Sequence, residues 1–383
     1  MSDLKLLISG WFKYPHSFSY VNLEQLLPLS DKSIDLYVDH RAPLFTNWLS
    51  CQSSESPLRD PRYKKLVSKL KPAIGGKFYD ASFDIAVPPI LSPFNSSRKS
   101  CFMVSEYGML SKEYIKLCGG NDSFRSLADS IDVIFTPSEW SKQAILKQDI
   151  DPNKIKVLPH GVDRKSFLTN SEVGESSFAN IRFPKGKIKV LHIGTPSFNK
   201  GTDLMIETIF KSPLAEHVCF IYKGNDSVYG SREKFTSYIN AMEKKYRKKV
   251  CTLYIGENMS RQMLSQLIAT ADIYFSPFRA EGFNMPVAEA AACATTLVVS
   301  KCPPVTEFLT DSPNIFWILT DKKDSEHGRY HEPSSSSALS AFNKAIEFCI
   351  KKVSEPATDY SSFQLNIMSW DKISRLLLSN LIQ

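Results

Sequence analysis

Short apolar runs separated by longer segments with helical spacing recur along the whole chain. Such runs, bounded by polar turns, predict buried strands, and their alternation with helical segments is typical of parallel α/β layers. The runs form two sets. The first occupies residues 4–9, 34–38, 83–87, 101–105, 131–136 and 155–158, and the second occupies residues 188–193, 217–222, 250–255, 272–276, 295–300 and 314–318.

The two sets predict two similar halves. DVIFTP at 132–137 and DIYFSP at 272–277 both end a strand in a hydroxyl residue and a proline. Between the sets, residues 169–187 are polar, contain glycine and proline, and lack periodicity, so we expect a linker there. The predicted fold class is therefore α/β, with Rossmann-like domains at 1–175 and 185–367.

Composition agrees with two domains and narrows the class of protein. With 383 residues, 43% of them hydrophobic, the chain is longer than a single domain with one hydrophobic core usually is. No apolar run approaches the roughly 18 residues of a membrane span, and the N-terminus lacks a signal-peptide pattern, so we expect a cytoplasmic protein. The eight cysteines show no C-x-x-C pair and are expected to be reduced core thiols, not metal ligands.

A net charge of +7 raises the question of anionic partners. Basic residues cluster at 62–71 and 244–249. No nucleic-acid-binding signature accompanies them, so a nucleic-acid partner is not expected. Solvated helix faces explain such clusters. The alternative for residues 62–71 is peripheral membrane contact, with Leu66, Val67 and Leu70 forming an apolar side beside the lysines.

The segment EGFNMPVAEAAACA at 281–294 carries the clearest chemistry. Pro286 suits a first helical turn because it lacks the N–H that would have no partner there, so a helix should open near this residue. The free amides of such a helix favour phosphate oxygens, and Gly282 lets the backbone approach a ligand closely. Glu281 and Glu289 can accept hydrogen bonds from pairs of hydroxyls, as a sugar and a ribose present them. The pattern predicts a nucleotide-sugar site.

Several longer motifs extend this interpretation. The segments are VIFTPSEWSKQAIL (133–146), VLPHGVDRKSF (157–167), VLHIGTPSFNKGTDLMIETI (190–209), SPFRAEGFNMPVAEAAACATTLVVS (276–300) and SWDKISRLLL (369–378). Together they resemble motifs of the retaining GT-B glycosyltransferases of the large family four, the group 1 glycosyltransferases, which carry an E-G-F-G-L-P signature followed by a second glutamate. The resemblance implies a GT-B fold in which a C-terminal helix, residues 368–383, crosses back to the first domain.

The resemblance also assigns roles in the second domain. Gly194 and Lys200 fall where the family turns around the diphosphate and binds it with a lysine. Glu289 should hold the ribose hydroxyls, and Glu281 should hold sugar hydroxyls across from the amides of Phe283–Met285. The implied donor is a nucleoside-diphosphate sugar, with UDP- or GDP-sugars favoured. No cofactor is expected, and no metal, since no acidic D-x-D pair suits a bridging cation.

In the first domain the resemblance is weaker. Glu106 follows a predicted strand and is expected to act near the sugar or the acceptor. The turn at Gly10 and Trp11 is expected to cover the donor phosphates. However, HSFSYVN at 16–22 stands where the family has a glycine-rich loop. The acceptor is therefore left open among a glycan, a lipid-linked hydroxyl and a small molecule.

Four further positions depart from the family pattern. Thr195 and Asn199 stand where an arginine usually accompanies the phosphate lysine, and Arg279 is expected to supply the second cation through a bidentate fork. Asn284 replaces the second glycine of the signature and is expected to narrow donor choice. His160 replaces an asparagine and is expected to be a hinge-loop residue, not a base.

Other functions remain open at this stage. A GT-B protein that binds sugars or nucleotides without catalysis would retain Lys200 and Glu289 but tolerate an altered loop at 16–22. A nucleotide-sugar epimerase with the same fold is a second alternative. A nicotinamide oxidoreductase is disfavoured, because no G-x-G-x-x-G follows any strand.

Overall fold

The chain forms two compact units in a computed structural model. Unit 1 comprises Met1–Gly161, Asp324–Arg329 and Met368–Gln383, and unit 2 comprises Val162–Lys323 and Tyr330–Ile367. The structure describes residues 4–42, 56–86, 92–110, 112–117, 124–163, 167, 181–326, 328–354 and 366–382. Most of the linker expected at 169–187 lies outside these residues.

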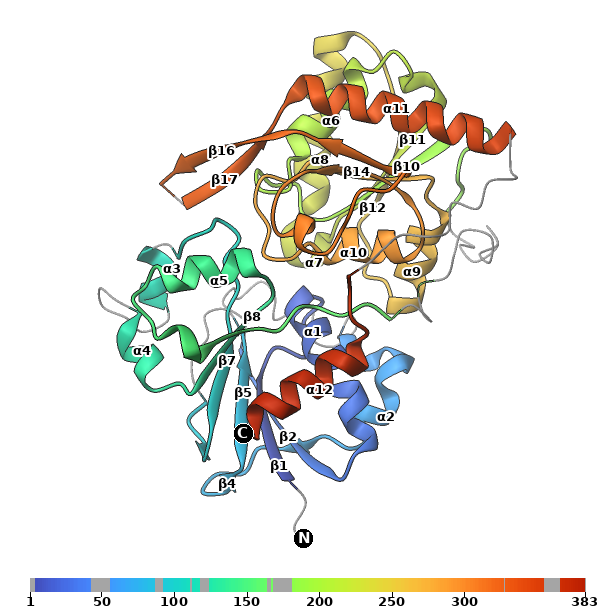
Figure 1. Cartoon of the computed structure of the whole chain (residues 1–383). Helices are drawn as coiled ribbons and strands as arrows, with labels where there is room; N and C mark the ends of the chain where they lie inside the picture. Colours follow the sequence, from blue (N-terminus) through green and yellow to red (C-terminus); the bar gives the residue numbers. More distant parts are fainter. Residues whose placement is uncertain are drawn as a thin grey trace. The chain divides into compact units, whose positions relative to one another are not determined.

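Unit 1 is built on a parallel sheet of seven strands in the order β3-β2-β1-β5-β7-β8-β9. Figure 1 shows this sheet in the part of the chain coloured blue to green. Its central strands are buried on both faces, as expected of a sheet covered on both sides. The strands are β1 (Leu4–Gly10), β2 (Ile34–His40), β3 (Lys71–Pro72), β5 (Ala81–Ile85), β7 (Lys99–Phe102), β8 (Val133–Thr136) and β9 (Ile155–Val157), with a separate pair β4 (Phe78–Tyr79) and β6 (Asn95–Ser96).

In sequence, the helices of unit 1 lie between its strands, except for α12. Ser138 caps one of them, α5, by accepting a hydrogen bond from the Ser141 amide at 3.1 Å. The helices are α1 (Ser17–Leu26), α2 (Lys64–Val67), α3 (Lys112–Leu117), α4 (Arg125–Asp129), α5 (Glu139–Leu146) and α12 (Trp370–Leu381).

The last helix, α12, packs on unit 1 although it follows unit 2 in sequence. Figure 1 shows it, in red, close to α1, in blue. Its apolar face is buried, and the Ser374 hydroxyl donates to the Gln25 carbonyl at 2.6 Å. The Gly161 backbone lies so close that an added Cβ would stand 2.7 Å from the Trp370 amide nitrogen. The return of the C-terminal helix to the first domain is confirmed.

Unit 2 contains a parallel sheet of six strands in the order β12-β11-β10-β13-β14-β15. This is the doubly wound order: successive strands are added on one side of β10 and then, from β13 onward, on its other side. Here that switch point lies between β10 and β13. The strands are β10 (Ile188–Ile193), β11 (Val218–Lys223), β12 (Cys251–Ile255), β13 (Ile273–Ser276), β14 (Thr296–Ser300) and β15 (Ile315–Ile318).

The helix expected at Pro286 is present. It begins at Met285, with Pro286 in its first turn and Asn284 as its N-cap. The sequence did not predict the hairpin of β16 (Thr320–Ser325) and β17 (Gly328–Pro333), because its strands are mostly polar. The helices of unit 2 are α6 (Thr202–Lys211), α7 (Asp226–Tyr229), α8 (Ser231–Tyr246), α9 (Arg261–Thr270), α10 (Met285–Ala292) and α11 (Ser335–Ser354).

The basic cluster at 62–71 does not form the apolar side expected for membrane contact. Leu66 is fully buried inside unit 1, while Val67 is only partly exposed. Arg62 pairs with Glu24 at 2.8 Å. Two lysines of the cluster, Lys65 and Lys71, pair with Asp31 and Asp35. Within the described parts of the chain, no helix is both long enough and apolar enough to span a bilayer.

Candidate functional site

Two loops meet at the switch point of unit 2 and are locked together by their backbones. Gly201 has a φ of 67°, and a side chain there would collide with the Pro277 carbonyl oxygen. The Arg279 amide donates to the Asn199 carbonyl at 2.7 Å, and the Ala280 amide donates to the same oxygen at 3.2 Å. The loop after β10 is therefore held against the loop after β13, where ligands of doubly wound sheets bind.

This backbone clamp brings together two predicted site residues, Lys200 and Glu281. The Lys200 ammonium donates to Oε1 of Glu281 in a direct ion pair. The Glu281 side chain is 6% exposed, whereas Lys200 is 24% exposed. At Gly194, an added Cβ would lie 3.7 Å from the Lys200 side chain, so the glycine turn and the lysine border the same space. The arrangement offers a partly accessible cation beside a fixed carboxylate.

The helix start next to this pair explains the residue at 284. Asn284 has a φ of 71°, a left-handed conformation that asparagine tolerates better than most residues with a side chain. Its Nδ2 donates to the Ser276 hydroxyl at 3.3 Å. Phe283 stacks on Phe308 with ring centroids 4.9 Å apart. Gly282 is buried and Met285 is partly buried, so the turn before α10 is rigidly packed.

Both predicted glutamates lie near one buried ring, that of Tyr274. Burial raises the pKa of the Tyr274 hydroxyl well above its usual value, and the negative charges of Glu281 and Glu289 raise it further. Glu289 itself is buried on α10 and accepts a hydrogen bond from the Arg261 guanidinium. The structure thus places both carboxylates near the Tyr274 ring, each with a cationic partner. Arg261 was not predicted from the sequence.

His192 is a second residue that the sequence did not single out. Its Nδ1 lies 2.8 Å from the Phe275 carbonyl oxygen, so Nδ1 carries a proton and donates. Burial, and to a lesser extent the nearby charge of Lys200, lower the pKa of His192 to about 4, so the ring is neutral at pH 7. An added Cβ on Gly194 would lie 3.1 Å from its Nε2. His192 therefore underlies the glycine turn as an uncharged ring.

Arg279 lies in the loop after β13, as expected, but its guanidinium is paired with two carboxylates of unit 2. Its guanidinium donates to Asp203 at 2.6 and 2.9 Å, to Glu332 at 2.9 Å, and to the Phe198 carbonyl at 3.0 Å. Burial lowers the pKa of Arg279, but the hydrogen bonds that its guanidinium donates to Asp203 and Glu332 outweigh this effect and raise the pKa overall. Two carboxylates already neutralise this arginine. This pairing does not favour a phosphate-binding role for Arg279. Its contacts with Asp203, Glu332 and the Phe198 carbonyl stabilise the loop that carries Glu281.

Gly10 lies at the carboxyl end of β1 in unit 1. A side chain there would collide with the Ile85 carbonyl oxygen, which explains the glycine. Asn22 donates to the Trp11 carbonyl at 3.1 Å, and His16 caps α1 by accepting from the Phe18 amide at 3.2 Å. Aromatic packing and a capped helix thus stand where the family has a glycine-rich loop.

Glu106 lies in the loop that follows β7, and that loop is fastened to α5. The indole of Trp140 donates to the Glu106 carbonyl at 2.9 Å, and the Ser141 hydroxyl donates to the Ser105 carbonyl at 2.8 Å. Gly108 has a φ of 59° and lies against the Trp140 ring. The backbone of Glu106 is therefore fixed, and its side chain is partly buried.

One further carboxylate of unit 1 escaped the sequence analysis. Asp84 on β5 is buried, and Arg41 lies 3.6 Å from it. Burial raises the pKa of Asp84 to about 7, while Arg41 opposes this shift. Its neighbour in the sheet register, Ser9, donates to Asp39 at 3.1 Å. The strand pattern alone could not distinguish Asp84 from a solvated polar position.

Comparison with known proteins agrees with this geometry. Residues 174–326 match the family model described as glycosyl transferases group 1. The GPI3 subunit of phosphatidylinositol N-acetylglucosaminyltransferase from Saccharomyces cerevisiae is 27% identical over 236 residues, which is 61% of this chain and 46% of that protein. An N-acetylgalactosaminyltransferase from Campylobacter jejuni is 27% identical over 204 residues, 52% of this chain and 49% of that protein. The chain thus spans about half the length of these curated relatives.

Solved structures share the fold across nearly the whole chain. A HepE protein from Anabaena in complex with UDP and glucose has a TM-score of 0.69 at 14% identity, with 99% of each chain covered. WaaG, described as a glycosyltransferase involved in lipopolysaccharide biosynthesis, has a TM-score of 0.57 at 13% identity, covering 98% of this chain and 95% of that one. The fold is GT-B, with two Rossmann-like units. Within residues 174–326, the chain is similar to the group 1 family of glycosyl transferases.

Proposed function

We propose that this protein is a retaining, metal-independent glycosyltransferase that moves a sugar from a nucleoside-diphosphate sugar to a hydroxyl group. The observation that carries the proposal is the Lys200–Glu281 pair at the switch point of unit 2, next to the start of α10. A cation, a carboxylate and the amides of a helix start are the groups that a diphosphate and a sugar require. The similarity of residues 174–326 to the group 1 glycosyl transferases supports the same activity.

Each donor-site residue takes a role from its surroundings. Lys200 and the amides of Phe283–Met285 bind the diphosphate. Glu281 accepts hydrogen bonds from sugar hydroxyls, and Glu289 accepts them from the ribose. Gly194 and Gly282 admit the ligand because they carry no side chain. The HepE structures with UDP and with UDP-glucose support a UDP-sugar as the first donor to test.

The reaction follows from where charge develops. When the bond between the sugar and the diphosphate breaks, its electron pair passes to a phosphate oxygen, and Lys200 with the α10 amides stabilises the added negative charge. The acceptor oxygen then bonds to the sugar from the same face, and the leaving phosphate takes the acceptor proton. This course retains the anomeric configuration. Glu106 in unit 1 remains our candidate for a contact with the sugar or the acceptor.

The acceptor we favour is a lipid-linked hydroxyl. The yeast relative is a phosphatidylinositol N-acetylglucosaminyltransferase by name, and the Campylobacter jejuni relative is named for transfer to a diacetylbacillosaminyl-diphospho-undecaprenol. Both names describe acceptors that carry a lipid. A soluble glycan is the alternative.

The proposal predicts selective stabilisation by one class of nucleotide sugar. Thermal unfolding should be measured with UDP-, GDP-, ADP- and dTDP-sugars, with the free sugars as controls. At a ligand concentration of 100 times the Kd, binding to the folded state adds about 2.7 kcal/mol to the free energy of unfolding. We expect a rise in Tm with one base and none with free sugars. No rise with any nucleotide sugar would contradict the proposal.

A further inference from the structure

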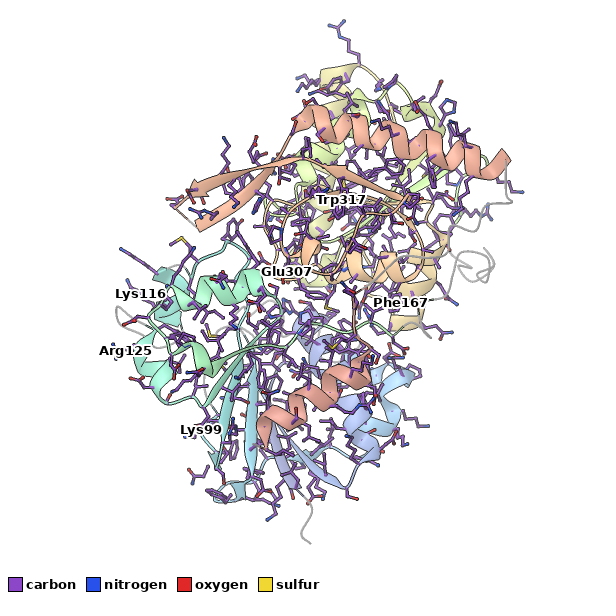
Figure 2. The ribbon with its side chains drawn as sticks, viewed as in Figure 1. Lys99, Lys116, Arg125, Phe167, Glu307 and Trp317 are labelled. Atoms are coloured by element: carbon purple, nitrogen blue, oxygen red, sulfur yellow. The ribbon has the colours of Figure 1, made fainter. Side chains whose placement is uncertain are left out.

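A buried ion pair joins α9 to α10 in unit 2. Arg261, the first residue of α9, donates from its guanidinium to Oε1 of Glu289. The Arg261 and Glu289 side chains are 7% and 3% exposed. The ring of Phe167, labelled in Figure 2, lies 5.4 Å from the Arg261 guanidinium carbon. The pair is thus enclosed on at least one side by an aromatic face.

Helix stability does not account for this arginine. A cation in the first turn of a helix faces the positive end of the helix dipole and is disfavoured there. The start of α9 already has its cap, since the Ser260 hydroxyl accepts from the Met263 amide at 3.2 Å. Burying two charges also costs desolvation free energy, so a buried pair is weak evidence of a purely structural role.

The carboxylate that Arg261 holds is the one proposed to bind the ribose. A carboxylate recognises two adjacent hydroxyls only when it is ionised and its plane is fixed, because both hydroxyls must donate to it. A guanidinium meets both requirements: it carries a permanent charge, and it holds a carboxylate oxygen in a defined direction.

We infer that Arg261 is a positioning residue that fixes Glu289 for recognition of the ribose diol. The pair then determines that the protein selects ribonucleotides over 2′-deoxyribonucleotides. This inference rests on the proposed function, because it assumes a nucleoside diphosphate in unit 2. Arg261 lies on α9, outside the motifs that define the donor site, and controls the selectivity for the ribose.

The test is the ratio of two affinities. Calorimetry should compare UDP, or GDP or ADP if one of these binds tighter, with its 2′-deoxy form. The intact protein should prefer the ribonucleotide by roughly tenfold or more, as expected for a hydrogen bond to a charged acceptor. In Arg261→Met the preference should fall to near unity, and in Arg261→Lys part of it should remain. The ratio of nucleoside-diphosphate to nucleoside affinity should stay close to that of the intact protein, since Lys200 controls it.

Two further variants separate positioning from damage to the fold. Arg261→Met with Glu289→Gln removes both charges, so it should fold, and its selectivity should equal that of Glu289→Gln alone. Arg375→Met breaks an exposed pair with Asp371 in unit 1 and should leave selectivity unchanged. Preserved ribose selectivity in Arg261→Met, or an equal loss of diphosphate recognition, would overturn the inference. An intact protein that binds no nucleotide would overturn the proposed function as well.

Discussion

Replacing Lys200 by alanine is expected to reduce glycosyl transfer by roughly 10²- to 10³-fold, the usual loss when one group that stabilises transition-state charge is removed. Lys200 is the partly accessible cation at the switch point and is held beside Glu281. Steady-state kinetics with the preferred nucleotide sugar would measure the loss. Nucleoside-diphosphate affinity should fall far more than nucleoside affinity, because only the diphosphate carries the charge that Lys200 meets.

Two controls make this prediction specific. Lys244→Ala removes an exposed lysine from the last turns of α8 and should leave both affinities unchanged. Lys200→Ala combined with Glu281→Gln avoids leaving the buried carboxylate without its cation, so a remaining loss of diphosphate affinity cannot come from an unpaired Glu281. Equal losses of nucleoside and nucleoside-diphosphate affinity would remove Lys200 from the phosphate site.

Deleting residues from Ser369 onward is expected to destabilise unit 1 severely. The deletion removes four buried apolar side chains of α12, those of Trp370, Ile373, Leu377 and Leu381. At roughly 1.5 to 3 kcal/mol each, their burial contributes about 6 to 12 kcal/mol, which is comparable to the whole stability of an ordinary domain. The Tm should fall by roughly 12 °C or more, or unit 1 should fail to fold, as circular dichroism would show.

Point variants on α12 give the matched comparison. Leu377→Ala should lower the free energy of unfolding by about 2 to 5 kcal/mol, since Leu377 is fully buried. Arg375→Ala, on the exposed side of the same helix, should change it by no more than about 1 kcal/mol. A truncated protein that melts at the same temperature as the intact one would refute the docking of α12.

Much of the fold could be predicted because strands of a doubly wound sheet are short, apolar and buried on both faces. DIYFS at 272–276 and LKLLIS at 4–9 indicated β13 and β1 by composition alone. Pro286 marked the start of α10 because its geometry suits a first turn. The β16/β17 hairpin was missed for the converse reason: TDKKDS buries almost nothing, so no hydrophobic pattern announces it.

The site could be predicted only where one contiguous motif contains it. Glu281, Gly282 and Glu289 lie in a single segment, and Lys200 lies in a second. Ion pairs between distant segments leave no such signal. The partner of Glu289 on α9, Arg261, was missed because the two residues are 28 positions apart. The partners of Arg279 were missed for the same reason, because Asp203 and Glu332 come from α6 and β17.

Product analysis in the presence of EDTA tests the central claim most directly. The protein should be incubated with its preferred nucleotide sugar and a panel of lipid-linked and glycan acceptors. Released nucleoside diphosphate would be quantified, and proton NMR would give the anomeric configuration of the new linkage. We predict turnover that survives EDTA and a product with the configuration of the donor. An inverted product, or turnover that is lost in EDTA and restored by magnesium or manganese, would contradict the account.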